Sequence, residues 1–254
     1  MAAPKKTRKA AVPSSVARSV STGSRGKITP TQAKKSAQDT FQRLRELHPD
    51  AHCELTHENP FQLLVATVLS AQSTDVAVNK VTPTLFRRWP NAQALADAPV
   101  EEVQQELSVL GMFRQKAKNI TGLAKKLVAD HGSEVPRTLT ELIALPGVGR
   151  KTANVVLGVA FGAPEGVVVD THVQRISQRL GWTSETTPEK IEAELMKRFP
   201  REVWDPLSHT LIFHGRRLCV ARSPACAACG VSAACPSAFN AENVGRKPAR
   251  KPRA

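Results

Sequence analysis

Apolar side chains recur at helical spacing along most of the chain. In residues 31–48, Phe41, Leu44 and Leu47 stand three positions apart with polar residues between them, which predicts an amphipathic helix. Residues 60–72 are apolar on nearly every side and predict a buried central helix. The same reading predicts further helices over residues 100–110, 113–131, 138–145, 149–161, 171–180, 188–199 and 206–218.

The ends of these segments are typical of helices, and the chain lacks the alternation of apolar and polar residues that is typical of strands. Gly132 follows the segment 113–131 at the place of a helix C-cap. Residues 167–169 are strand-like, but the run is too short and too isolated to build a sheet. No repeat of fixed period is visible. The sequence therefore predicts an all-α fold.

Length and hydropathy restrict the class of protein further. The chain has 254 residues, of which 41% are hydrophobic, enough for one large or two small domains with a real core. The longest apolar runs, residues 63–69 and 155–160, fall far short of the roughly 18 residues that a membrane span needs. No hydrophobic signal segment stands near residue 1. We expect a monomer that is neither secreted nor associated with a membrane.

Charge is concentrated at the two ends. Of a net charge of +14, residues 1–30 hold +7 and residues 246–254 hold +5. These tails have almost no large apolar residues, so we expect them to be disordered and to attract a polyanion such as nucleic acid. Two alternatives stay open: purely solubilising tails and, ranked lower, an organellar transit peptide at the start. In a bacterium we expect a cytoplasmic, nucleoid-associated protein; organellar or nuclear targeting is left open.

Four of the five cysteines lie within 17 residues and predict a metal site. Cys219, Cys226, Cys229 and Cys235 have the spacing C-x6-C-x2-C-x5-C. Disulfide bonds fit this sequence poorly, because no secretion signal precedes the cysteines. Zinc sites usually have two short Cys-x2–4-Cys pairs, whereas this segment has one. The wider spacing favours an iron–sulfur cluster over zinc, and Cys53 stands apart as an ordinary thiol.

A glycine-rich turn joins two predicted helices at residues 145–153. Gly147 and Gly149 permit a tight turn and let a phosphate approach the backbone, although a plain turn explains them equally well. Arg150 and Lys151 follow in the first turn of a helix, where the macrodipole disfavours cations. From these residues alone, Lys151 is either a nucleophile that must first lose its proton or a phosphate contact.

A carboxylate follows about twenty residues later. The apolar run 167–169 delivers Asp170 to the start of the next predicted helix. Helix capping alone would justify an aspartate there, but one carboxylate can both cap and take part in catalysis. The spacing lets the intervening helix and turn bring Asp170 back towards Lys151.

Together these three motifs resemble the endonuclease III family of DNA glycosylases, which belongs to the helix-hairpin-helix superfamily. The resemblance extends over residues 31–240 and includes the segments 69–75 and 110–113. It implies two helical domains with a DNA cleft between them. The implied division is a basic tail (1–30), a first helix in the cluster domain (31–55), a six-helix domain with the helix-hairpin-helix motif (56–165), the rest of the iron–sulfur domain (166–240) and a basic tail (241–254).

The resemblance also implies an activity, bifunctional removal of oxidised pyrimidines from duplex DNA in base excision repair. Lys151 takes the position of the nucleophile that forms a Schiff base, and Asp170 that of the essential carboxylate. Gln72 corresponds to the residue that fills the gap left by a flipped base, and Met112 to an apolar wedge that is commonly leucine. Further DNA contacts are expected at Gly147, Gly149, Arg150, His172 and Arg175, and a [4Fe–4S] cluster on Cys219, Cys226, Cys229 and Cys235.

One departure and two rivals accompany this interpretation. The loop 220–225 contains only Arg222, where the family usually has more basic residues, so phosphate binding there is expected to be weaker. An adenine-mismatch glycosylase shares the hairpin, the aspartate and the cysteine spacing, but generally lacks the lysine. A non-catalytic DNA-binding protein is the rival from another class, and it leaves the pair Lys151 and Asp170 unexplained.

Overall fold

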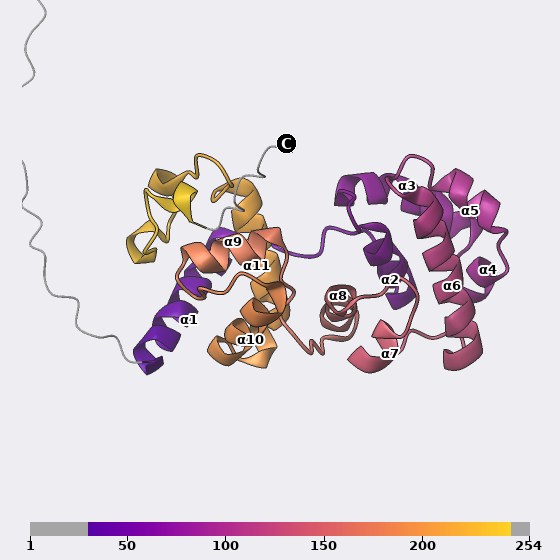
Figure 1. Cartoon of the computed structure of the whole chain (residues 1–254), viewed down its shortest axis with the longest axis horizontal. Helices are drawn as coiled ribbons and strands as arrows, with labels where there is room; N and C mark the ends of the chain where they lie inside the picture. The colour runs from indigo at the N-terminus through magenta and orange to yellow at the C-terminus, as the bar shows by residue number, and fades with distance from the viewer. Residues whose placement is uncertain (1–29, 245–254) are drawn as a thin grey trace, which may run out of the picture.

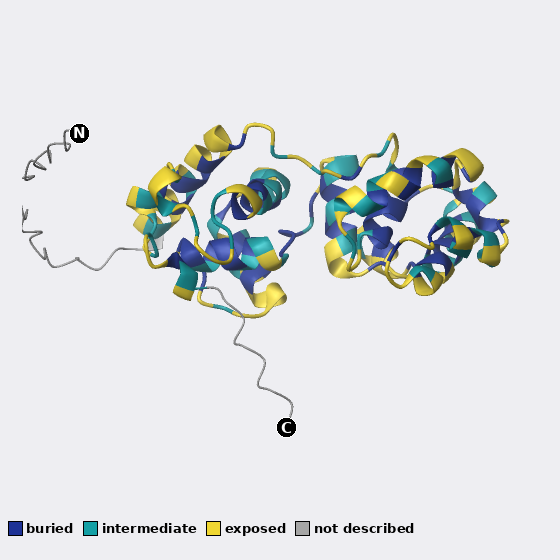
Figure 2. Ribbon diagram, turned by 90° about the horizontal axis from the view of Figure 1, so that it is seen from above, coloured by how far each residue is buried: buried dark blue, intermediate teal, exposed yellow. Residues whose placement is uncertain are grey.

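The computed structural model describes residues 30–244, and every regular element in that range is a helix. Figure 1 shows two helical lobes side by side, joined by two extended segments of chain. Each lobe has its own apolar centre, as the buried inner faces of the helices in Figure 2 show. The predicted all-α class is confirmed. None of the described helices is long and apolar enough to cross a membrane.

The first lobe is formed by the middle of the chain. Its centre is α2, in which nine consecutive residues are buried; Asn59 caps this helix through a bond from the Gln62 amide and Pro60 opens it. Around it lie six further helices. These are α3 (Asp75–Arg88), α4 (Ala92–Ala96), α5 (Val100–Glu106), α6 (Phe113–His131), α7 (Leu139–Ile143) and α8 (Arg150–Phe161), with α2 spanning Pro60–Leu69.

The second lobe combines the first helix of the described chain with the last ones. Helix α1 packs against α10 and α11, and Phe41, Leu44 and Phe199 are part of the core that they share. The bounds are α1 (Pro30–Leu47), α9 (Thr171–Arg179), α10 (Pro188–Arg198) and α11 (Trp204–Arg217), followed by short 3-10 turns over Cys226–Ala228, Ser232–Ala234 and Ala241–Asn243.

All the predicted helices are present, with ends shifted by a few residues, and Gly132 is the left-handed C-cap of α6. Two helices were not predicted. Helix α3 has Pro83 in its interior and several β-branched residues, which weaken a helical signal, and α4 is only five residues long. Residues 167–169 are buried without forming a strand.

The predicted tails differ from the structure at one boundary. Residues 1–29 and 245–254 lie outside the described range, so the expected disorder there stays a prediction. Residues 241–244, which were assigned to the C-terminal tail, instead belong to the second lobe: Ala241 is buried, and the Val244 carbonyl accepts a hydrogen bond from Arg179.

Candidate functional site

A polar cleft lies where the two lobes meet, and it brings the two predicted catalytic residues together. Lys151 comes from α8 of the first lobe and Asp170 from the start of α9 in the second, and both line the same cavity of about 350 Å³. Other lining residues come from the chain between the lobes, the start of α3 and α11: His52, Cys53, Glu54, Asp75, Ser208, His209 and Arg216.

The glycine-rich turn places Lys151 at this cleft. The Val148 amide donates to the Leu145 carbonyl at 3.1 Å, and Gly147 has a φ of +77°, as in a turn of type II. A Cβ on Gly147 would lie 2.8 Å from Nδ2 of Asn119. The turn therefore requires glycine at this position, both for its conformation and for its close approach to α6.

Gly149 has a different role in the same turn. It is the N-cap of α8 with a φ of −95°, a conformation open to any residue, and a Cβ there would meet nothing within 4 Å. The backbone at the start of α8 is thus open to solvent, and Lys151 is exposed beside it. Free amides at a helix start suit an anion such as a phosphate.

Arg150 turns away from Lys151 and joins the lobes. Its guanidinium forms a forked ion pair with Glu192 on α10, with Nε to Oε2 at 3.0 Å and Nη2 to Oε1 at 2.9 Å. Glu192 is buried, and its hydrogen bonds raise the pKa of Arg150. Arg150, predicted to contact DNA, has a structural partner within the protein.

Asp170 is the N-cap of α9, which is the capping role that its place before the predicted helix suggested. Its Oδ1 accepts from the amides of His172 and Val173, both at 2.8 Å. Among the hydrogen bonds of the described residues, none uses its second oxygen. The capping bonds therefore fix the carboxylate at the cleft while leaving Oδ2 for a ligand or for an incoming amine.

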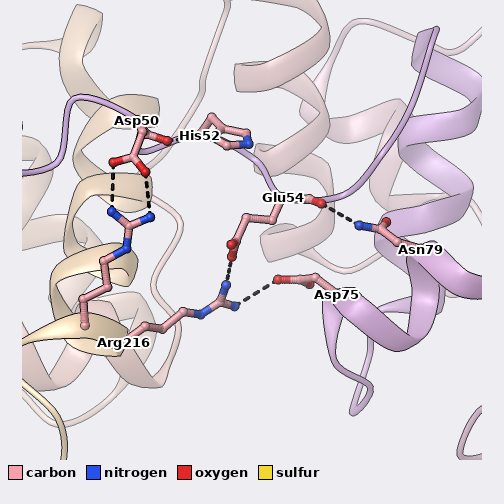
Figure 3. A network of polar contacts seen from close by, with 7 residues as sticks. Asp50, His52, Glu54, Asp75, Asn79 and Arg216 are labelled. Carbon is pink, nitrogen blue, oxygen red and sulfur yellow. Dashed lines mark hydrogen bonds and ion pairs between the residues drawn. The ribbon is translucent and has the colours of Figure 1, made fainter.

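An ionic network connects residues that line the cleft (Figure 3). Arg216 on α11 pairs with Glu54 and, through Nη2 to Oδ2 at 2.9 Å, with Asp75. Burial and the charge of Asp170 raise the pKa of Asp75, whereas Lys151 acts in the opposite direction. Asp75 and Lys151 therefore share one electrostatic environment.

Sequence reasoning missed this network. Glu54, Asp75 and Arg216 are up to 162 residues apart and form no local motif. The available signal was weak: Asp75 ends the segment 69–75 that carried the family resemblance, and Arg216 precedes the first cluster cysteine.

Two other predicted DNA contacts lie on exposed turns of the first lobe. Gln72 has a φ of 55° and Met112 a φ of 56°, in the left-handed region that non-glycine residues seldom adopt. Gln72 is exposed and lines the cleft, and Met112 is 51% exposed. Both side chains are available to a partner.

His172 and Arg175 differ from each other in exposure. Arg175 is 8% exposed, and its Nη2 donates to the Gly215 carbonyl at 2.9 Å and to the Cys219 carbonyl at 3.2 Å. It fixes the end of α11 and presents no exposed guanidinium to DNA in this arrangement. His172 is half-buried, and burial lowers its pKa.

The four predicted ligand cysteines gather around one cavity of the second lobe, which they line together with Arg179 and His214. Burial raises the pKa of the Cys229 and Cys235 thiols, and the charge of the neighbouring cysteine sulfurs acts in the same direction. Four cysteine side chains around one cavity are the kind of donor set that an iron–sulfur cluster uses. Within residues 30–244, no three His, Cys, Asp or Glu side chains form a site for a single metal ion.

Buried polar side chains form hydrogen bonds with the sulfurs of these cysteines. Arg179, with 1% of its surface exposed, donates through Nη1 to Cys219 Sγ at 3.3 Å and to the Val220 carbonyl at 2.8 Å. His214 approaches Cys229 Sγ through Nε2 at 3.7 Å. Such donors orient ligand sulfurs and stabilise their negative charge.

Comparisons with known proteins agree on one family. A family model described as HhH-GPD superfamily base excision DNA repair protein matches residues 65–201. The endonuclease III of Synechocystis sp. is 51% identical over 205 residues, which is 81% of this chain and 94% of that protein. The endonuclease III of Escherichia coli K12 is 42% identical over 193 residues, covering 76% of this chain and 91% of the other.

Solved structures give the same result. A trapped endonuclease III–DNA covalent intermediate is 45% identical with a TM-score of 0.77, covering 82% of this chain and 97% of that one. A non-covalent endonuclease III–DNA complex is 44% identical, with the same TM-score and the same coverage. A thermostable thymine-DNA glycosylase, 22% identical with a TM-score of 0.72 and covering 81% and 96% of the two chains, shares the fold.

Proposed function

The chain belongs to the endonuclease III family of the HhH-GPD superfamily, and on that premise we propose that Lys151 and Asp170 carry out its chemistry. The protein is a base excision repair enzyme, a DNA glycosylase with AP lyase activity that acts on DNA. The observation that carries the assignment of residues is that Lys151 and Asp170, from different lobes, line one cleft.

The reaction uses Lys151 as the nucleophile. Its neutral amine attacks C1′ of a flipped nucleotide, the N–C1′ bond forms, and the bond to the base breaks as the base leaves with the electron pair. Asp170 accepts the proton of the attacking amine and stabilises positive charge at the sugar. The sugar ring then opens: the C1′–O4′ bond breaks, O4′ takes a proton, and an iminium forms between the Lys151 nitrogen and C1′. Loss of a proton from C2′ of this iminium expels the 3′ phosphate by β-elimination.

The substrate we propose is an oxidised or ring-saturated pyrimidine in duplex DNA. The cleft offers both hydrogen-bond donors and acceptors to a flipped base, from Arg216 and from Glu54 and Asp75. A damaged base stacks poorly, so it costs less to flip than a normal one. Polar groups in the cleft suit the extra hydroxyl and carbonyl groups of such lesions.

A [4Fe–4S] cluster is the group that we propose for the four cysteines. Cys219, Cys226, Cys229 and Cys235 would hold it, each through its thiolate. When bound, the cluster supplies iron–thiolate bonds that cross-link residues 219–235. Arg179 and His214 fit this assignment because they place donors next to ligand sulfurs.

The experiment that tests the function uses duplexes with a single thymine glycol, 8-oxoguanine, adenine opposite 8-oxoguanine, or abasic site. We expect release of thymine glycol with strand cleavage by β-elimination, and cleavage of the abasic strand. Release of adenine without cleavage would assign the adenine-mismatch activity instead. Binding without release or cleavage of any substrate would contradict an enzymatic function.

A further inference from the structure

Helix α6 contains a buried lysine that the mechanism does not use. Lys116 is 3% exposed, and its Nζ donates to Ser73 Oγ at 2.6 Å. The ion pairs of the described residues do not include Lys116, and burial lowers its pKa. Burying an ammonium group without a carboxylate costs free energy of folding. An apolar residue at this position would therefore make the core more stable.

Lys116 contacts two strained turns at once. Its backbone amide donates to the Met112 carbonyl at 3.0 Å, at the left-handed residue that opens α6. Its ammonium group reaches Ser73, which directly follows the left-handed residue Gln72. Left-handed turns without glycine persist only where surrounding contacts hold them.

The same helix also supports the glycine-rich turn. Asn119, one turn after Lys116, lies so close to Gly147 that no Cβ fits between them, and its Oδ1 accepts a bond from Gln115 at 2.8 Å. The first half of α6 therefore contacts three exposed turns whose residues are proposed to meet DNA. Lys116 is the buried charged side chain in this half-helix.

We propose that Lys116 is a positioning residue that couples the Gln72 turn to the Met112 turn through Ser73, so that the two side chains enter the DNA as one unit. The inference rests on the proposed function, because that function gives Gln72 and Met112 their contacts with the helix gap. The bond from Lys116 to Ser73 fixes the spacing between the two inserted side chains before DNA arrives.

Coupling of this kind affects one step of the reaction selectively. Excision of a damaged base requires its extrusion from the stack, which the inserted side chains stabilise. Cleavage at a preformed abasic site needs no base to be extruded. Loss of the Lys116–Ser73 bond is therefore expected to slow base excision more than abasic-site cleavage.

The test compares Ser73→Ala and Lys116→Met with the wild-type protein in single-turnover assays on thymine glycol and abasic duplexes. We expect excision to fall about tenfold or more in both variants and abasic-site cleavage to change less than about threefold. Ser73→Thr, which keeps the hydroxyl, is expected to excise the base at a rate close to that of the wild-type protein. Lys126→Met is the matched control, since Lys126 lies on the same helix in an exposed pair with Asp130.

The outcomes separate this inference from the proposed function. If the wild-type protein excises no lesion, the proposed function fails. If the wild-type protein is active, equal losses on the two substrates would overturn the coupling, as would unchanged excision in Ser73→Ala. Should Lys116→Met fail to fold, Ser73→Ala and Ser73→Thr still decide the question, because Ser73 is partly exposed and removal of its hydroxyl leaves no large cavity.

Discussion

Arg216 on α11 and Asp75 at the start of α3 form an ion pair of 2.9 Å that joins the two lobes across the cleft that both residues line. The same guanidinium pairs with Glu54 in the chain between the lobes. One cation thus neutralises two carboxylates that line the cleft.

Arg216→Met is expected to weaken DNA binding clearly while changing the free energy of unfolding only slightly. The free energy of unfolding should fall by no more than about 1 kcal/mol, because the pair is partly exposed. The two freed carboxylates should raise KM several-fold at low salt and less at high salt, since salt screens the repulsion. The control is Arg217→Met, which breaks the pair with Asp50 next to the network; an equal, salt-dependent rise in KM there would contradict the prediction.

The two glycines of the hairpin turn should respond differently to alanine. Gly147→Ala must place a Cβ at a positive φ and against Asn119, so the free energy of unfolding should fall by about 1–3 kcal/mol. Gly149→Ala meets open space and should leave stability within about 1 kcal/mol, yet it should weaken DNA binding where the amides of α8 are exposed. Denaturant unfolding and duplex titration measure the two effects; identical behaviour of both variants would refute the distinction.

Arg179 should be needed to retain the proposed iron–sulfur cluster. Its guanidinium donates to the carbonyls of Val220, Ala221 and Val244 as well as to Cys219 Sγ. Arg179→Met would remove these four part-buried hydrogen bonds at once, at about 0.5–1.5 kcal/mol each. We expect iron content per chain to drop well below that of the wild-type protein, whereas Arg222→Met, in the exposed loop, should retain it. Full iron retention in Arg179→Met would contradict the supporting role.

His214 should make stability depend on pH. Burial, followed by the charges of His48 and Arg175, lowers the pKa of His214 from 6.5 to about 4. Between these values the unfolded chain binds a proton that the folded chain does not. The contribution of His214 to the free energy of unfolding is therefore complete above pH 6.5. As the pH falls from 6.5 towards 4, this contribution is lost at no more than about 1.4 kcal/mol per pH unit.

Denaturant unfolding at pH 7, 6 and 5 measures this slope. His214→Asn should have a lower stability at pH 7 but a flatter dependence on pH, because the titrating group is gone. His131→Asn, at the C-terminal end of α6 where the side chain is partly exposed, should keep the wild-type slope. A slope unchanged in His214→Asn would show that other groups cause it.

Local patterns predicted what local forces determine. The helix ends at Gly132 and Asp170 follow from capping within a few residues, and the hairpin follows from two glycines in one short turn. Side-chain direction was not predictable: Arg150 and Lys151 are adjacent, yet one pairs with Glu192, 42 residues away, and the other lines the cleft.

Arg175 shows the same limit in the second lobe. The family resemblance implied a DNA contact for Arg175, whereas its hydrogen bonds go to carbonyls 40 and 44 residues away. The bridge through Arg216 likewise joins segments that share no pattern in the chain. Contacts of this kind arise only when the two lobes pack, so spacing along the sequence carries no signal for them.

The most direct measurement of the central claim is borohydride trapping on an abasic duplex, followed by mass spectrometry of the cross-linked peptide. The wild-type protein is expected to form a covalent adduct through Lys151, and Asp170→Asn to form it more slowly. Lys151→Gln should form none while still binding the duplex with an affinity within a few-fold of wild type. An undiminished adduct in Lys151→Gln, or an adduct mapped to another lysine, would contradict the assignment of Lys151 as the nucleophile.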